Sequence, residues 1–91
     1  MAMIGMDVEA VRQHATQLNG QADQIEHIIN AINGLVGQIE GAWQGNDARE
    51  FKSQWEGTHR TALHNAEQMI RELVHTANAQ ASQQEQASSN Y

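Results

Sequence analysis

Ten apolar residues between positions 8 and 39 are spaced alternately three and four residues apart, and this regularity constrains the fold more than any other feature. The spacing is that of the a and d positions of a heptad repeat (abcdefg), which places all ten on one stripe of a helix. Asp7 precedes the stripe and is predicted to cap the helix N-terminus. We therefore predict a helix over residues 8–42. The ten residues are Val8, Val11, Ala15, Leu18, Ala22, Ile25, Ile29, Ile32, Val36 and Ile39.

A second apolar row lies beside this stripe, at the g position, and consists of Ile28, Leu35 and Ala42. A strict a/d stripe serves contact with one helix, whereas a broader apolar face suits a bundle of several helices. We expect the chain's own second helix to cover the a/d stripe. The g row is then left over, and a partner chain is expected to cover it.

Trp43-Gln44-Gly45 interrupts the heptad pattern near the middle of the chain. Continuing the same phase would place Asn46 and Glu50 in the core, where polar side chains do not belong. We therefore predict a turn over residues 43–47. Because Trp43 continues the a row, we expect it to pack in the core, with its ring edge still open to a partner.

A second apolar stripe predicts another helix over residues 48–78, entered through the capping-box spacing of Asp47 and Glu50. Beyond it the chain is rich in Ala, Gln, Ser and Asn, so we expect residues 79–91 to form a flexible tail. Residues 1–91 are thus predicted to be one all-α domain, an antiparallel helix-turn-helix hairpin. The stripe comprises Ala48, Phe51, Trp55, Ala62, Leu63, Ala66, Met69, Ile70, Leu73, Val74 and Ala77.

The composition argues against most other classes of protein. The chain has no proline to interrupt long helices and no cysteine for disulfides or thiolate metal sites. Its net charge is −6 and its five basic residues are scattered, so we expect no nucleic-acid binding. No segment approaches the roughly 18 apolar residues of a membrane span, and the polar face is acidic, so we expect no membrane binding. A core this small favours oligomerisation.

No catalytic, cofactor or metal site is predicted, and we do not expect an enzyme. The histidines lack the i,i+4 spacing of a helical zinc pair, and no serine has a glycine elbow or a neighbouring base. We interpret the histidines as solvated surface residues; the alternative is a response of an assembly to acid. The five histidines are His14, His27, His59, His64 and His75.

The length, the two helices, the lack of cysteine and the central Trp43-Gln44-Gly45 make the chain resemble the WXG100, or ESAT-6-like, family. The resemblance covers roughly residues 1–78. It implies a hairpin that dimerises into a four-helix bundle. It also implies export by a type VII (ESX) secretion system, without a cleaved signal peptide and after a cytoplasmic stage. An ATPase of that system is expected to recognise the turn, through Trp43 and Gly45.

One part of the family's export signal is not matched. Family members commonly carry Tyr-x-x-x-Asp/Glu just after the second helix, but Tyr91 is the last residue and Ala81 stands four residues before Glu85. Either a partner supplies this signal or the tail uses other features. We favour a homodimer over a heterodimer with a WXG100 paralogue, although a homodimer doubles the charge to −12. The predicted partner interface comprises Ile28, Leu35, Ala42, Phe51 and Trp55.

The predicted function is that of a small ESAT-6-like protein, exported as a folded helical dimer and acting through protein–protein interaction. The alternative is an intracellular helical adaptor, or a coiled-coil structural protein, that is not exported.

Overall fold

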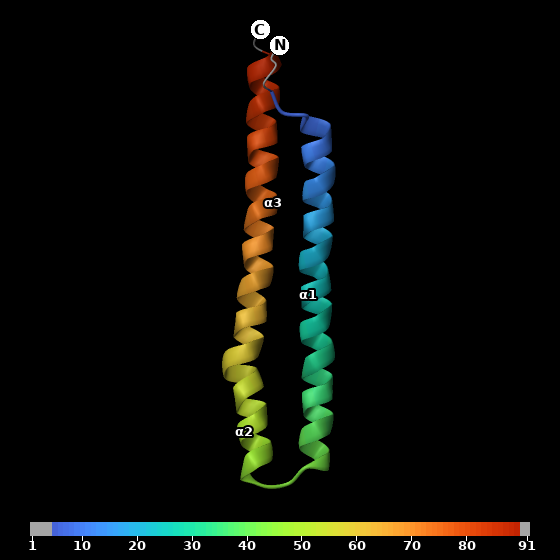
Figure 1. Ribbon diagram of the computed structural model, residues 1–91, viewed down its shortest axis with the longest axis vertical. Coiled ribbons are helices and arrows are strands. Elements are labelled where there is room, and N and C mark those ends of the chain that lie inside the picture. The colour runs from blue at the N-terminus through green and yellow to red at the C-terminus, as the bar shows by residue number, and fades with distance from the viewer. Residues whose placement is uncertain (1–4, 90–91) are drawn as a thin grey trace.

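The computed structural model describes residues 5–89, apart from the side chains of 88 and 89, and forms two long helical arms joined by one turn (Figure 1). The first arm is α1, Val8–Ala42. The second arm is continuous and comprises α2 (Asn46–Gln54), a π-helical turn η1 (Trp55–His59) and α3 (Arg60–Ser89). The two arms run antiparallel in a rod of 69 × 17 × 15 Å. The predicted all-α hairpin is confirmed.

Helix α1 begins and ends where its sequence pattern predicts. Asp7 Oδ1 accepts a hydrogen bond of 3.0 Å from the backbone N–H of Ala10, which satisfies one of the free donors of the first turn. The helix ends because Trp43 takes an extended conformation, with φ −131° and ψ 119°. The N–H of Trp43 still donates to the carbonyl of Glu40.

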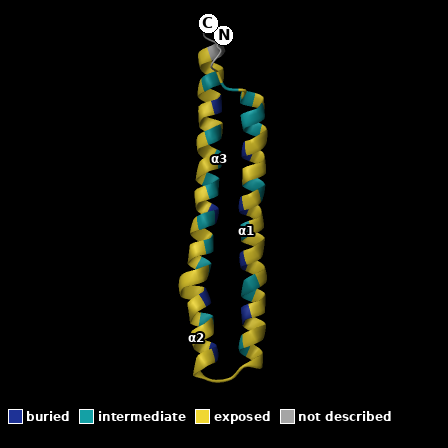
Figure 2. Ribbon diagram, viewed as in Figure 1, coloured by how far each residue is buried: buried dark blue, intermediate teal, exposed yellow. Residues whose placement is uncertain are grey.

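The core is a single row along the inner side of each arm (Figure 2). On α1 the buried residues are Ala15, Ala22, Ile29 and Val36, each seven residues from the next. Near the turn, Ile29 and Val36 pack with Trp55 in the main apolar cluster. Toward the termini the buried residues of α1 are alanines, so that half of the hairpin buries less apolar surface.

The π-helical turn η1 explains why the apolar period of the second arm is irregular. A π turn inserts one extra residue into a helix and shifts the phase of everything that follows. Trp55 and Arg60 are five residues apart, yet both donate hydrogen bonds to Asn33 of α1.

The second arm is longer than its composition predicts. It begins at Asn46, with Gly45 as N-cap and no side-chain cap, so the capping box of Asp47 and Glu50 is not formed. It continues to Ser89, so the prediction of a flexible tail from residue 79 is wrong.

The extra turns are stabilised by α1, a contact that composition alone does not reveal. Ala81 is fully buried, and Arg12 binds both Glu85, at 3.0 Å, and the hydroxyl of Ser82, at 3.3 Å. Alanine and glutamine are also good helix formers, so little local preference opposes the helix here. Residues 90 and 91 of the predicted tail lie outside the described residues.

Candidate functional site

The two sides of the hairpin differ sharply in chemistry. We assign heptad position a of α3 to the buried Glu67 and Ala81, which face the a row of α1. In an antiparallel pair of helices the two e rows then lie along one side of the contact and the two g rows along the other. The e side carries hydrogen bonds and ion pairs, and the g side is apolar.

On the e side, polar contacts join the two arms both near the termini and near the turn. Arg12 binds Glu85 near the termini, and Lys52 binds Glu40 at 3.1 Å near the turn. The hydrogen bond from Arg12 is the main cause of a lowered pKa of Glu85, and that from Lys52 to Glu40 raises the pKa of Lys52. These groups are partly exposed to solvent, so each pair adds little stability but helps to set the register of the two arms.

Arg71 forms the densest of these contacts. Its guanidinium donates to Glu67 Oε2 at 2.8 and 3.0 Å and to Asn19 Oδ1 at 2.9 Å. It also lies 3.0 Å from Asp23, and the hydrogen bonds to Glu67 and Asp23 raise the pKa of Arg71. Glu67 is buried, and its Oε1 accepts no hydrogen bond from the described residues. His64 Nδ1 lies 3.6 Å from that oxygen.

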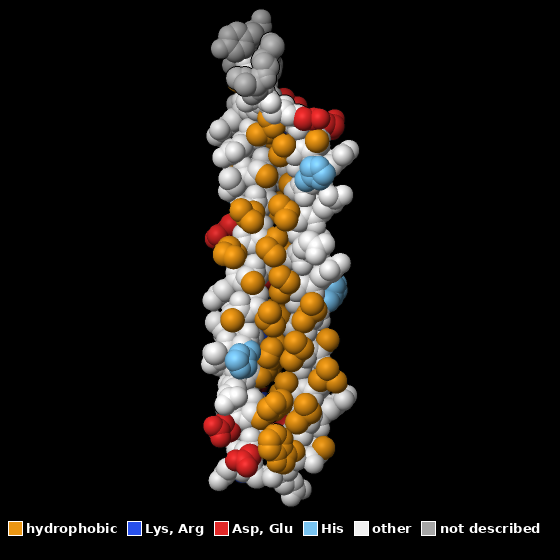
Figure 3. Space-filling view, viewed as in Figure 1, with side chains coloured by type: hydrophobic (Ala, Val, Ile, Leu, Met, Phe, Trp, Pro, Cys, Tyr) orange, Lys and Arg blue, Asp and Glu red, His pale blue; other side chains and the backbone are white. Residues whose placement is uncertain are grey.

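The g side exposes large hydrophobic side chains on both arms. Ile28 and Leu35 of α1 are 50% and 56% exposed, and Met69 and Leu73 of α3 are 61% and 55% exposed. Figure 3 shows hydrophobic side chains running along both arms on one face, and no lysine or arginine on that face within the described part of the chain. We call this surface the apolar face; it comprises Leu18, Ile28, Leu35, Ile39, Met69 and Leu73.

The structure agrees only in part with the predicted partner interface. Ile28, Leu35 and Ala42 are exposed, as is Phe51. The a/d stripe, however, is not fully covered by the second arm, because Leu18 and Ile39 at d also remain exposed. A single facing helix covers the a row and leaves part of the d row at the edge.

Trp55 and Trp43 exchange the roles that the sequence pattern predicts. Trp55 is 7% exposed, and its indole N–H donates to Asn33 Oδ1 at 2.6 Å, so its assignment to a partner interface is wrong. Trp43 is 42% exposed, so its assignment to the core is also wrong. Helix α1 ends before Trp43, so the side chain of Trp43 does not continue the a row of the helix. Its ring lies against Phe51, with the centroids 5.9 Å apart and the planes at 52°.

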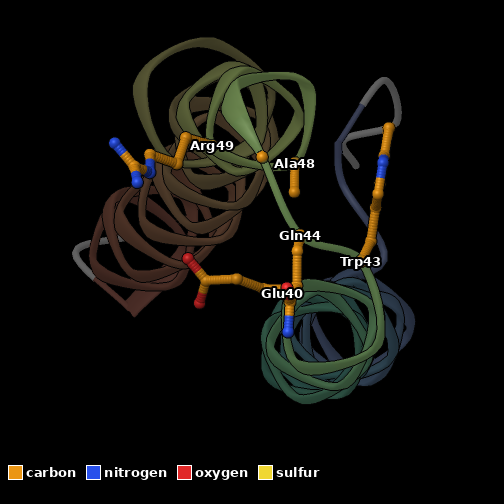
Figure 4. A pocket seen from close by; sticks show the side chains of 6 residues that line it. Glu40, Trp43, Gln44, Ala48 and Arg49 are labelled. Carbon is orange, nitrogen blue, oxygen red and sulfur yellow. The ribbon is translucent and has the colours of Figure 1, made fainter.

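Gly45 makes the turn possible. Its φ of +114° lies in a region that residues with a Cβ rarely adopt, and no atom stands near where a Cβ would be. A shallow pocket of about 400 Å³ borders the turn, lined by Glu40, Trp43, Gln44, Gly45, Ala48 and Arg49. In Figure 4 the side chains of Trp43 and Arg49 point to opposite sides of the turn. Trp43 therefore turns toward Phe51 and away from the basic side chain.

Across residues 5–89, no cluster of three or more His, Cys, Asp or Glu side chains is arranged to hold a metal ion. None of the helices in that range is long and apolar enough to cross a membrane.

Residues 3–89 match the WXG100 family, described as proteins of 100 residues with WXG. The chain belongs to the WXG100 family. No curated protein and no solved structure matches it. As a WXG100 protein it is a small ESAT-6-like protein of the type VII secretion class. Trp43-Gln44-Gly45 forms the turn between α1 and α2, whereas Trp55-Glu56-Gly57 lies within η1.

The sequence pattern did not predict the polar contacts of the e side. The signal was present in the e row of α1, where every residue is polar, in contrast to the g row, which is apolar at positions 28, 35 and 42. Its partners on α3 could not be paired with it, because the π turn changes the phase of the second arm. The e row of α1 comprises Arg12, Asn19, Glu26, Asn33 and Glu40.

Proposed function

We propose that this WXG100 protein is exported by a type VII secretion system as a folded homodimer, built through the apolar face. The exposure of Ile28, Leu35, Met69 and Leu73 on one side of the hairpin carries this proposal. Large contiguous apolar surfaces on small proteins mark protein–protein contacts. The opposite side is already closed by the contacts of Arg71 and its neighbours, so one face is left to bind a partner hairpin.

The charge distribution favours a second copy of the chain as the partner. In α1 and in α3, positions c, d and g contain no Asp, Glu, Lys or Arg. Two apolar faces therefore meet without bringing like charges into contact, although the dimer carries a charge of −12. A two-fold arrangement, in which the same patch faces itself, is the common form of such dimers. The product is a four-helix bundle. A heterodimer with a WXG100 paralogue is the alternative.

The turn is proposed to be the part that the secretion ATPase recognises. Trp43 is exposed at the end of the rod, and Gly45 holds the backbone in a conformation that other residues rarely adopt. A rigid aromatic side chain at an exposed end is a suitable anchor for a partner. The cytoplasmic stage and the absence of a cleaved signal peptide belong to the same proposal.

Light scattering of the purified chain tests the dimer. We expect a species of twice 10.1 kDa, and we expect Leu35→Asp with Leu73→Asp to convert it to a folded monomer. The matched control is Gln13→Asp with Gln68→Asp, which adds the same charge at exposed positions outside the apolar face. A wild-type chain that is monomeric, cooperatively folded and dimeric only with a paralogue would contradict the homodimer.

Export is tested separately, by comparing culture supernatant and washed cells with and without an intact secretion system. We expect wild type in the supernatant only when the system is intact. A chain that stays in the cells while the system exports other substrates would instead indicate an intracellular adaptor.

A further inference from the structure

A second pocket at the turn has a chemistry of its own. It is a shallow pocket of about 350 Å³, lined by Trp43, Asp47, Glu50, Phe51 and Gln54. Two aromatic rings form its apolar part, and two carboxylates from the first turns of α2 border it. The aromatic pair is partly exposed, with Trp43 at 42% and Phe51 at 38%.

The pocket continues the apolar face but differs from it in charge. With Ala48 and Trp55 buried seven residues apart, Phe51 falls at position d and Asp47 at position g of α2. Glu50 then takes position c. In α1 and α3 the c, d and g rows are free of Asp, Glu, Lys and Arg, whereas α2 carries Asp47 and Glu50 at these positions. Figure 3 shows acidic side chains beside the hydrophobic stripe near the turn.

Neither carboxylate has a cationic partner among the described residues. Arg12, Lys52 and Arg71 are paired with other acidic residues, all on the e side. Arg60 is held by Asn33, on the other arm. Arg49 points to the opposite side of the turn from Trp43 (Figure 4). Within residues 5–89, therefore, no Lys or Arg side chain pairs with the carboxylates of this pocket.

We infer that this pocket binds an arginine side chain from a basic segment of a partner protein. A guanidinium is planar and weakly hydrated, so it stacks on an aromatic ring while its N–H groups donate to carboxylates at the ring edge. The rings of Trp43 and Phe51 and the carboxylates of Asp47 and Glu50 offer both kinds of contact in one pocket. A lysine ammonium would use the charge but not the planar stacking. The inference rests on the proposed function in one respect: the proposed recognition of the turn by the secretion ATPase identifies the protein that supplies the basic segment.

Nuclear magnetic resonance of the full-length chain tests the pocket directly, since the two tryptophans report on different places. The probe is a blocked Gly-Arg-Gly-Arg-Gly peptide, added to the ¹⁵N-labelled protein. We expect the indole N–H signal of Trp43 to shift. The indole N–H of Trp55 is bonded to Asn33 inside the hairpin and should stay in place, which makes it an internal control. A peptide with citrulline in place of arginine keeps the shape without the charge and should bind weakly.

The matched variants separate the pocket from the overall charge. Asp47→Asn with Glu50→Gln should weaken peptide binding roughly fivefold or more, since two charge-assisted contacts are lost. Glu9→Gln with Glu72→Gln removes the same charge at exposed positions away from the turn and should leave binding nearly unchanged. Equal weakening in both variants, equal binding of the citrulline peptide, or an unshifted Trp43 signal would overturn the inference.

Further outcomes distinguish a failure of the inferred pocket from a failure of the proposed homodimer. If the Trp43 signal moves in the same way when the protein alone is concentrated, the occupant is a second copy and the assignment to a partner's arginine is wrong. Normal dimerisation together with absent peptide binding counts against the pocket alone. A monomeric chain that binds the peptide counts against the homodimer and leaves the pocket supported.

Discussion

The indole N–H of Trp55 donates a hydrogen bond of 2.6 Å to Asn33 Oδ1 across the hairpin. The same oxygen accepts a second bond of 3.3 Å from Arg60, so one amide of α1 binds both ends of the π turn. This contact fixes where the phase shift of the second arm lies. It also takes Trp55 out of any role at the surface.

Asn33→Ala tests this contact. The buried indole donor loses its partner, so we expect a loss of about 1–3 kcal/mol in the free energy of unfolding, measured by urea titration. Asn30→Ala is the matched control, because Asn30 is exposed on the same helix, and it should change stability by less than about 0.5 kcal/mol. Equal effects of the two substitutions would mean that the hydrogen bond adds no stability.

The two tryptophans should respond very differently to truncation. Trp55→Ala removes a buried side chain and should cost about 3–5 kcal/mol, whereas Trp43→Ala removes one that is 42% exposed and should cost about 1 kcal/mol. Thermal unfolding followed by circular dichroism gives both values. If Trp43→Ala remains folded and its export is lost, the ring serves recognition. A large stability loss at Trp43 would show that dimerisation buries it.

Arg71 keeps the buried carboxylate of Glu67 compensated. Arg71→Met should lower the free energy of unfolding, because it leaves the buried carboxylate of Glu67 without its guanidinium partner. Glu67→Leu combined with Arg71→Met should recover most of that loss, since no charge is then left buried. Chemical unfolding of the single and double variants provides the comparison. A double variant as unstable as Arg71→Met alone would contradict this view of the pair.

The contact between the termini should depend on pH. The pKa of Glu85 is lowered by the hydrogen bond from Arg12, below its ordinary value of 4.5. A lowered pKa in the folded state means that the stabilisation is complete above pH 4.5 and is lost as the pH falls through the lower folded value. Hydrogen exchange in residues 79–87 should therefore accelerate in that acidic range. Glu85→Gln should exchange faster at neutral pH and lose this dependence on pH.

Gly45 should tolerate substitution poorly for reasons of conformation alone. A Cβ at this position meets no neighbouring atom, but the φ of +114° is strained for any other residue. Gly45→Ala should cost on the order of 1–3 kcal/mol in thermal unfolding. Gly41→Ala, in the last turn of α1, should instead stabilise the helix slightly, because Gly41 is helical and has open space around it. Similar losses at the two sites would rule out strain at Gly45 as the cause.

The sequence by itself determined the hairpin. The unbroken heptad of residues 8–39, the cap at Asp7 and the break at Trp43 depend on neighbours within one or two helical turns. Such local patterns are legible in a chain because helix formation is itself local. The exposure of Ile28 and Leu35 also followed, since a hairpin has one second helix with which to cover α1.

Only the tertiary structure decided which residues meet across the arms. The π turn at Trp55 shifts the phase of the second arm. Counting residues in both directions from the turn therefore does not predict that Arg71 pairs with Asn19 or that Arg12 pairs with Glu85. The helix reaches Ser89 because Ala81 packs on α1, although the local composition resembles a tail. These contacts join residues 52 to 73 positions apart, and their stability comes from packing and pairing that no local pattern encodes.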